Sequence, residues 1–169
     1  MTSHDENDDQ VVQQVWDAVE QGATLKDVYG VPDDIMQGLY ALAYDHYQRR
    51  QLDEAEKIFR FICVYDFYNV DYMLGLGAVM HCKGEYKQAI DYYAVAFSIG
   101  KNDYRPMFYI GQCQLAMRHP KLARKSFEFV VRSCSDQALC DKAQVYLDTL
   151  RNNVSASTLQ EERGEEKSV

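Results

Sequence analysis

One spacing constrains this chain of 169 residues more than any other feature, because the same residue types return every 34 positions. Small residues recur at Ala55, Ala89 and Ala123. Large aromatic residues follow each of them by four positions, and these are Phe59, Tyr93 and Phe127. Units of this length hold two short amphipathic helices that cannot bury their apolar faces alone, so neighbouring units must stack. The spacing therefore predicts an all-α solenoid.

The pattern is typical of the tetratricopeptide repeat. We expect three repeats in a short superhelical solenoid, at residues 36–69, 70–103 and 104–137. Apolar residues at helical spacing between Asp9 and Gln21 predict an N-terminal helix that ends near Gly22, and Thr24 with Asp27 predicts a capping box after it. Pro120 suits the first position of a helix.

The ends of the chain differ in composition from the repeats between them. A capping helix at about 136–151 should close the solenoid, so we expect one domain over residues 9–151. Residues 1–8 and 152–169 are expected to be flexible tails, because they are acidic and hold few apolar residues. These tails carry most of the formal net charge of −8.

Composition also excludes several functions. A sequence pI near 4.9 argues against direct nucleic-acid binding, and no apolar run approaches the roughly 18 residues of a membrane span. The acidic start lacks the features of a secretory signal, and an odd number of cysteines without CxxC spacing indicates reduced thiols in the cytoplasm. We found no catalytic, cofactor or metal motif, so we expect no enzyme, cofactor or metal site. The basic cluster Arg118–Lys125 is interpreted as a solvated face or a docking patch for an acidic partner.

A second apolar face on the first helix of each repeat gives the candidate site. Positions four, seven, eight and eleven of the repeat should face the core, so positions five, nine and twelve need another partner. These residues are Tyr40, Tyr44 and Tyr47 in the first repeat, Leu74, Ala78 and His81 in the second, and Phe108, Gln112 and Leu115 in the third. We expect all but Leu115 to form a concave peptide-binding groove, because concave faces are the usual binding surfaces of solenoids. The alternative is internal packing between repeats, or cover by the N-terminal helix.

Four longer stretches carry a more specific resemblance. They are residues 22–27 (GATLKD), 59–69 (FRFICVYDFYN), 92–97 (YYAVAF) and 101–104 (KNDY). Together they resemble the class II chaperones of bacterial type III secretion systems, which hold the translocator proteins before export. The likeness covers about residues 11–150 and is greatest to the invasion-associated branch found in enteric bacteria.

The resemblance implies a virulence-associated chaperone in the bacterial cytoplasm. Such a chaperone binds N-terminal extended segments of two hydrophobic translocators through the concave groove, without ATP, at the positions given above. It also implies assistance to an AraC-type transcription activator, and homodimers formed through the N-terminal helix region. The alternative is an adaptor or regulator that acts mainly on a transcription factor or another secretion component. A clamp for an acidic C-terminal peptide is disfavoured, because only Arg105 among the matching positions could grip a carboxylate.

Overall fold

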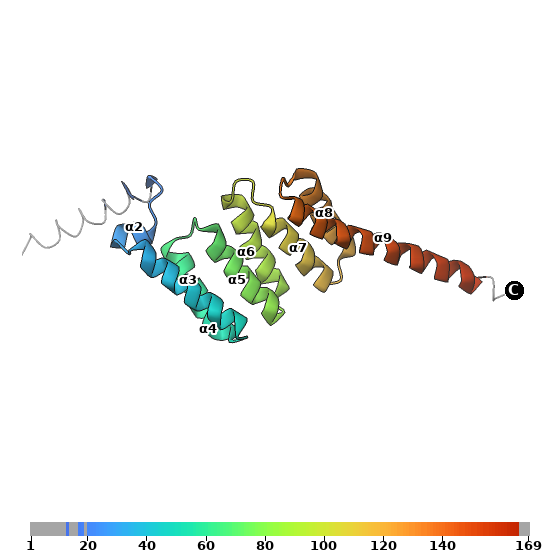
Figure 1. Ribbon diagram of the computed structural model, residues 1–169, viewed down its shortest axis with the longest axis horizontal. Helices are drawn as coiled ribbons and strands as arrows, with labels where there is room; N and C mark the ends of the chain where they lie inside the picture. Colours follow the sequence, from blue (N-terminus) through green and yellow to red (C-terminus); the bar gives the residue numbers. More distant parts are fainter. Residues whose placement is uncertain (1–12, 14–16, 19, 166–169) are drawn as a thin grey trace, which may run out of the picture. The chain divides into compact units, whose positions relative to one another are not determined.

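A computed structural model of the chain describes residues 13, 17, 18 and 20–165. The chain divides between Val79 and Met80 into two compact units, which we name unit 1 (residues 1–79) and unit 2 (residues 80–169). The described residues form eight helices and no strand, which confirms the predicted all-α class (Figure 1). The helices are α2 (Leu25–Tyr29), α3 (Asp33–Gln48), α4 (Leu52–Tyr65), α5 (Val70–Lys83), α6 (Tyr86–Ile99), α7 (Arg105–Ala116), α8 (Pro120–Ser133) and α9 (Gln137–Glu165).

The two helices of each predicted repeat are joined by the same kind of turn, placed 34 residues apart. Its central residue has left-handed backbone, with φ of 61° at Arg50, 79° at Gly84 and 60° at Arg118. In the second repeat the Gly84 N–H donates to the His81 carbonyl at 3.0 Å, and the other two turns repeat this bond. Such a turn ends a helix by satisfying its last carbonyl groups. Glycine adopts this backbone without strain, whereas the two arginines do not.

Unit 1 is built on the packing of α3 against α4. Ala43 and Ala55 are fully buried, and their small side chains allow the two helices to approach closely. Phe59 is 1% exposed and fills the space beside them. An added Cβ on Gly75 of α5 would overlap the Phe59 ring, so a glycine is needed at that contact. The predicted core positions of the first repeat therefore perform the expected packing.

In unit 2, α7 packs against both α6 and α8, and α9 packs on α8. The buried core of this end of the unit comprises Phe108, Ala123, Phe127, Val130, Leu139, Ala143 and Leu147. An added Cβ on Gly111 would lie 2.7 Å from the nearest carbon of the Phe127 ring, so the small residue allows the ring to sit against α7. Because α9 supplies three of these side chains, it covers the last repeat as the predicted capping helix should.

The ends of several helices follow their sequence signals. Thr24 and Asp27 form the predicted capping box at the start of α2, with the Thr24 backbone N–H donating to the Asp27 carboxylate at 2.9 Å. Pro120 is the first residue of α8, as predicted. Residues 13, 17, 18 and 20 are helical and Gly22 has φ of 88°, which agrees with a helix ending near Gly22. The rest of the predicted N-terminal helix and the tail 1–8 lie outside the described residues.

The last helix continues beyond the predicted boundary. We expected a capping helix to about residue 151 and a tail from 152, but α9 runs to Glu165. Residues 152–165 contain no proline and several good helix formers, and extending an existing helix needs no new nucleation. Composition alone marked this stretch as polar, and polarity does not end a helix.

Candidate functional site

An aromatic surface in unit 1 lies on α3 and is formed by Tyr40, Tyr44 and Tyr47, which we name the tyrosine face. The Tyr40 and Tyr44 rings stack with centroids 6.5 Å apart and planes 14° apart, and Tyr44 and Tyr47 lie 6.2 Å apart. Tyr44 is 47% exposed, whereas Tyr40 and Tyr47 are half-buried. The spacing of four and three residues places all three on one side of the helix, as predicted. The face offers apolar area together with hydroxyl groups.

Tyr40 is held in place by two further rings of unit 1. Its centroid lies 5.9 Å from Phe59 in an edge-on arrangement and 5.6 Å from Tyr72 of α5. Tyr72 was not among the predicted site residues, although it is an aromatic residue two positions before Leu74. Tyr72 is buried, and this burial, with a smaller contribution from Asp66, raises the pKa of its phenol above 10.0. The phenol therefore stays neutral, and the ring acts as a packing surface behind the tyrosine face.

The second-repeat residues are less exposed than we expected. Leu74 is 8% exposed and Ala78 is half-buried, both in unit 1. In unit 2, His81 is half-buried and its ring meets the edge of Tyr86 at 5.4 Å. Burial lowers the pKa of His81 below 6.5, so its imidazole is neutral at pH 7. These positions offer small apolar or neutral surfaces and no charge.

The third-repeat residues take part in the internal packing of unit 2. Phe108 is 6% exposed, and its ring centroid lies 5.6 Å from those of both Phe127 and Tyr146. Gln112 donates a hydrogen bond from Nε2 to the Tyr146 hydroxyl at 2.9 Å. Leu115 is also partly buried against this core. For this repeat the internal-packing alternative describes the side chains, and their part in a groove stays a prediction.

Tyr146 of α9 is a residue that the prediction omitted. It lies 34 positions after Gln112 and 102 after Tyr44, so it continues the same stripe into the last helix. Extending the repeat spacing by one more step past residue 137 would have found it. Its ring stacks on Phe127 with centroids 4.8 Å apart, and its hydroxyl accepts the Gln112 bond. The capping helix α9 thus holds, at Tyr146, the position equivalent to Tyr44 and Gln112 in the first helices of the repeats.

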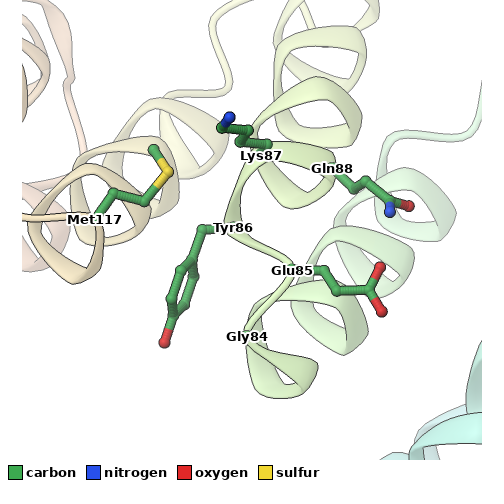
Figure 2. A pocket seen from close by; sticks show the side chains of 6 residues that line it. All are labelled: Gly84, Glu85, Tyr86, Lys87, Gln88 and Met117. Atoms are coloured by element: carbon green, nitrogen blue, oxygen red, sulfur yellow. The ribbon is translucent and has the colours of Figure 1, made fainter.

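A shallow pocket of about 360 Å³ lies in unit 2, where the start of α6 approaches the end of α7 (Figure 2). Its lining comprises Gly84, Glu85, Tyr86, Lys87, Gln88 and Met117. Glu85 and Lys87 give the rim one charge of each sign, while Tyr86 and Met117 provide apolar surface (Figure 2). The pocket contains none of the predicted site residues.

Two of the five cysteines, Cys63 and Cys113, are buried among apolar residues. Burial raises the pKa of the Cys63 thiol to about 12 and that of Cys113 to about 11. Both thiols are therefore protonated and poorly nucleophilic at neutral pH. Within the part of the chain that the structure describes, no group of three or more His, Cys, Asp or Glu side chains is placed to hold a metal ion. The described helices also include none with the length and apolar character needed to span a membrane.

Helix pairs in a 34-residue register, with small and aromatic residues at fixed core positions, define a tetratricopeptide-repeat protein. The sequence matches the tetratricopeptide repeat family at residues 36–69 and 70–103, which are the first two predicted repeats. It is 54% identical to the chaperone protein SicA of Salmonella typhimurium over 145 residues, which cover 86% of this chain and 88% of SicA. The chain belongs to this family, the tetratricopeptide-repeat chaperones of type III secretion translocators, as the resemblance predicted.

Solved structures agree with this assignment. A type III secretion complex from Aeromonas hydrophila superimposes with a TM-score of 0.76 at 26% identity, covering 85% of this chain and 98% of that one. PcrH from Pseudomonas aeruginosa gives a TM-score of 0.68 at 30% identity, covering 72% of this chain and 95% of PcrH. PcrH has also been solved in complex with the chaperone-binding regions of PopD and of PopB.

Proposed function

We propose that this protein binds hydrophobic translocator proteins of a type III secretion system in the bacterial cytoplasm and keeps them from aggregating before export. Support comes from family membership and from PcrH, a relative at 30% identity that binds the chaperone-binding region of PopD. Binding of an aggregation-prone partner lowers its free population by mass action. This function needs no covalent chemistry and no cofactor.

The observation that carries the proposal is the tyrosine face of α3. Three aromatic rings line one side of this helix, and Tyr44 is 47% exposed. Tyrosine is well suited to such a surface, because its ring buries apolar area while its hydroxyl tolerates water. We assign the tyrosine face as the place where an extended translocator segment buries its apolar side chains.

The remaining predicted residues differ in how much surface they offer to a partner. Ala78 and His81 are half-buried and stay in the proposed site. Leu74 and Phe108 are 8% and 6% exposed, so each presents only a small part of its side chain. Gln112 is already hydrogen-bonded to Tyr146, so a partner must share its amide group or replace this bond. The tyrosine face is therefore expected to supply most of the binding free energy.

The expected affinity is moderate. Each apolar side chain buried on the tyrosine face contributes about 1.5–3 kcal/mol, and two or three of them fit a stripe of this length. Association and ordering of an extended segment cost a comparable amount. A moderate affinity suits a chaperone that must release its partner for export.

The test uses Tyr44→Ala in the full-length protein. The ligand is a synthetic peptide covering the N-terminal segment of a translocator encoded beside the chaperone gene, and calorimetry measures Kd. We expect a 5- to 20-fold weaker Kd, because the substitution removes about 1–2 kcal/mol of apolar contact. Tyr29→Ala is the matched control, since Tyr29 of α2 is also in unit 1 and is 71% exposed. Equal affinity of the Tyr44→Ala protein and the wild type would contradict the proposed site.

Two further roles implied by the resemblance stay predictions. These are co-activation of an AraC-type transcription activator, and homodimer formation through the N-terminal helix region. A chain that acts mainly as a regulator should bind the activator equally well with and without translocator. A chaperone that assists the activator only after its translocators have been exported should bind the activator only when translocator is absent. Pull-down with purified activator, with and without translocator, distinguishes these cases.

A further inference from the structure

The exposed face of α8 is strongly basic on an otherwise acidic protein. Its buried side consists of Ala123, Ser126, Phe127 and Val130. The opposite side carries four cations and one acid, which are Lys121, Arg124, Lys125, Arg132 and Glu128, and Arg118 precedes the helix. Arg124 pairs with Glu128 at 2.8 Å. Among the described residues, no acidic side chain forms an ion pair with Arg118, Lys121 or Lys125.

The cation in the first turn of α8, Lys121, does not stabilise the helix. The first turn of a helix favours acidic side chains, because unpaired backbone N–H groups make that end positive. The first turn of α4 follows this rule with Asp53 and Glu54, whereas those of α6, α7 and α8 contain no acid, and α8 begins Pro120-Lys121. Residues that break a local rule of stability without a compensating contact often mark a functional surface.

Equivalent positions in the other repeats show that the fold does not require lysine here. Position eighteen of the repeat is Asp53 in the first repeat, Lys87 in the second and Lys121 in the third. Position twenty-two is Lys57 in the first repeat, Asp91 in the second and Lys125 in the third, so only the third repeat has a lysine at both positions. An acidic residue is therefore compatible with this fold at both positions. The concentration of positive charge belongs to the third repeat alone.

Apolar side chains lie beside the lysines on the same helix. Leu122 is 48% exposed and Phe129 is 39% exposed. Phe129 is supported from behind by Phe97 and Tyr104, with ring centroids 5.9 Å and 5.8 Å away. The face thus combines fixed apolar area with three cations that pair with no acid among the described residues, and it shares no residue with the tyrosine face.

We propose that the exposed face of α8 docks an acidic segment of a partner protein, with apolar residues placed between its carboxylates. Carboxylates would pair with Arg118, Lys121 and Lys125, while the apolar residues would cover Leu122 and Phe129. A nucleic acid fits less well, because a long polyanion would extend past this face onto a chain with a net charge of −8, whereas a short acidic segment need not. This site is independent of the translocator site.

The test measures binding of a fluorescein-labelled 12-residue peptide of Glu, Asp, Leu and Phe to the full-length protein by anisotropy at low salt. The double variant Lys121→Glu with Lys125→Glu should weaken binding at least tenfold. It should keep or raise the melting temperature, because an acid at position 121 suits the first turn of α8 and position 125 is exposed to solvent. The matched control is Lys101→Glu with Lys142→Glu, which changes the charge equally at exposed lysines outside α8 and should leave Kd within twofold.

Four further measurements complete the test. A peptide with Ser in place of Leu and Phe should bind at least fivefold more weakly, and added salt should weaken wild-type binding more than that of the double variant. Equal loss in the two double variants would overturn the proposal, since only net charge would then matter. Tighter binding of a 12-nucleotide DNA strand would overturn it in favour of nucleic acid. Peptide binding that appears only after deletion of residues 1–9 would overturn it in favour of the chain's own acidic start.

Discussion

The helices α3 in unit 1 and α7 in unit 2 are each the first helix of a repeat. They differ in how exposed they leave the residues at positions five and nine of the repeat. On α3 the tyrosine face keeps Tyr44 47% exposed, and its ring lies beside those of Tyr40 and Tyr47. On α7 the equivalent positions hold Phe108, which is buried, and Gln112, which is bonded to Tyr146 of α9. The repeat position determines the side of the helix on which a residue lies. The neighbouring helix determines whether that side is open to a partner.

The largest expected difference concerns aromatic residues on these two faces. Phe108→Ala should lower the free energy of unfolding by about 3–5 kcal/mol, because it leaves a cavity against Phe127 and Tyr146. Tyr44→Ala should change it by less than about 1 kcal/mol, because much of that ring is in water. Urea unfolding followed by circular dichroism measures both values. Similar losses in the two variants would show that the faces are equally buried and would remove the contrast.

The burial of Phe108 also affects how binding is tested. A Tyr40→Ala and Phe108→Ala double variant appears from the sequence to remove two surface contacts. In the structure Tyr40 packs on Phe59 and Tyr72, and Phe108 belongs to the core of unit 2. Loss of binding in that double variant would therefore combine destabilisation with loss of contact. Tyr44→Ala separates the two effects.

Glycine-to-alanine substitutions in α7 and α3 should have smaller effects on stability, and the two effects should be opposite in sign. Gly111→Ala in α7 should destabilise the protein by about 1–3 kcal/mol, because the new methyl group would meet the Phe127 ring at 2.7 Å. Gly38→Ala in α3 should stabilise it by about 0.5–1 kcal/mol, because no described atom lies within 4 Å of the added Cβ. Thermal unfolding of the two variants provides the comparison. Destabilisation by Gly38→Ala would indicate that this side of α3 is covered.

Much of the fold could be predicted, because its determinants are local and periodic. Ala55 and Phe59 repeat with a fixed spacing, and each is buried as its position requires. The capping box of Thr24 with Asp27 depends on residues three apart, and Pro120 restricts its own backbone. Signals of this kind need no knowledge of neighbouring helices, so the sequence contains them directly.

The site was less predictable, because its accessibility depends on contacts between residues far apart in sequence. Gln112 and Tyr146 are 34 residues apart, and a polar side chain at position 112 gives no sign that a hydroxyl will meet it. Tyr72 belongs to the next repeat and packs on Tyr40, but its position in the repeat is not one that the motif specifies. Helical spacing placed the three tyrosines on one side of α3, but it could not show that α9 covers the equivalent stripe on α7.

The smallest expected effect concerns the turns that follow the two helices. Arg118 after α7 and Arg50 after α3 both have left-handed backbone, which costs about 1–2 kcal/mol for a residue with a Cβ. Arg118→Gly removes this strain, but it also increases the entropy of the unfolded chain and removes a cation from the end of α7. We therefore expect a net stabilisation of about 0.5 kcal/mol. Arg118→Lys keeps both the charge and the Cβ and should change nothing, whereas Gly84→Ala at the equivalent turn should cost about 1 kcal/mol. If thermal unfolding shows Arg118→Gly to be destabilising, the favourable charge at the end of α7 outweighs the backbone strain. Electrostatics, and not backbone conformation, would then explain why arginine follows α3 and α7.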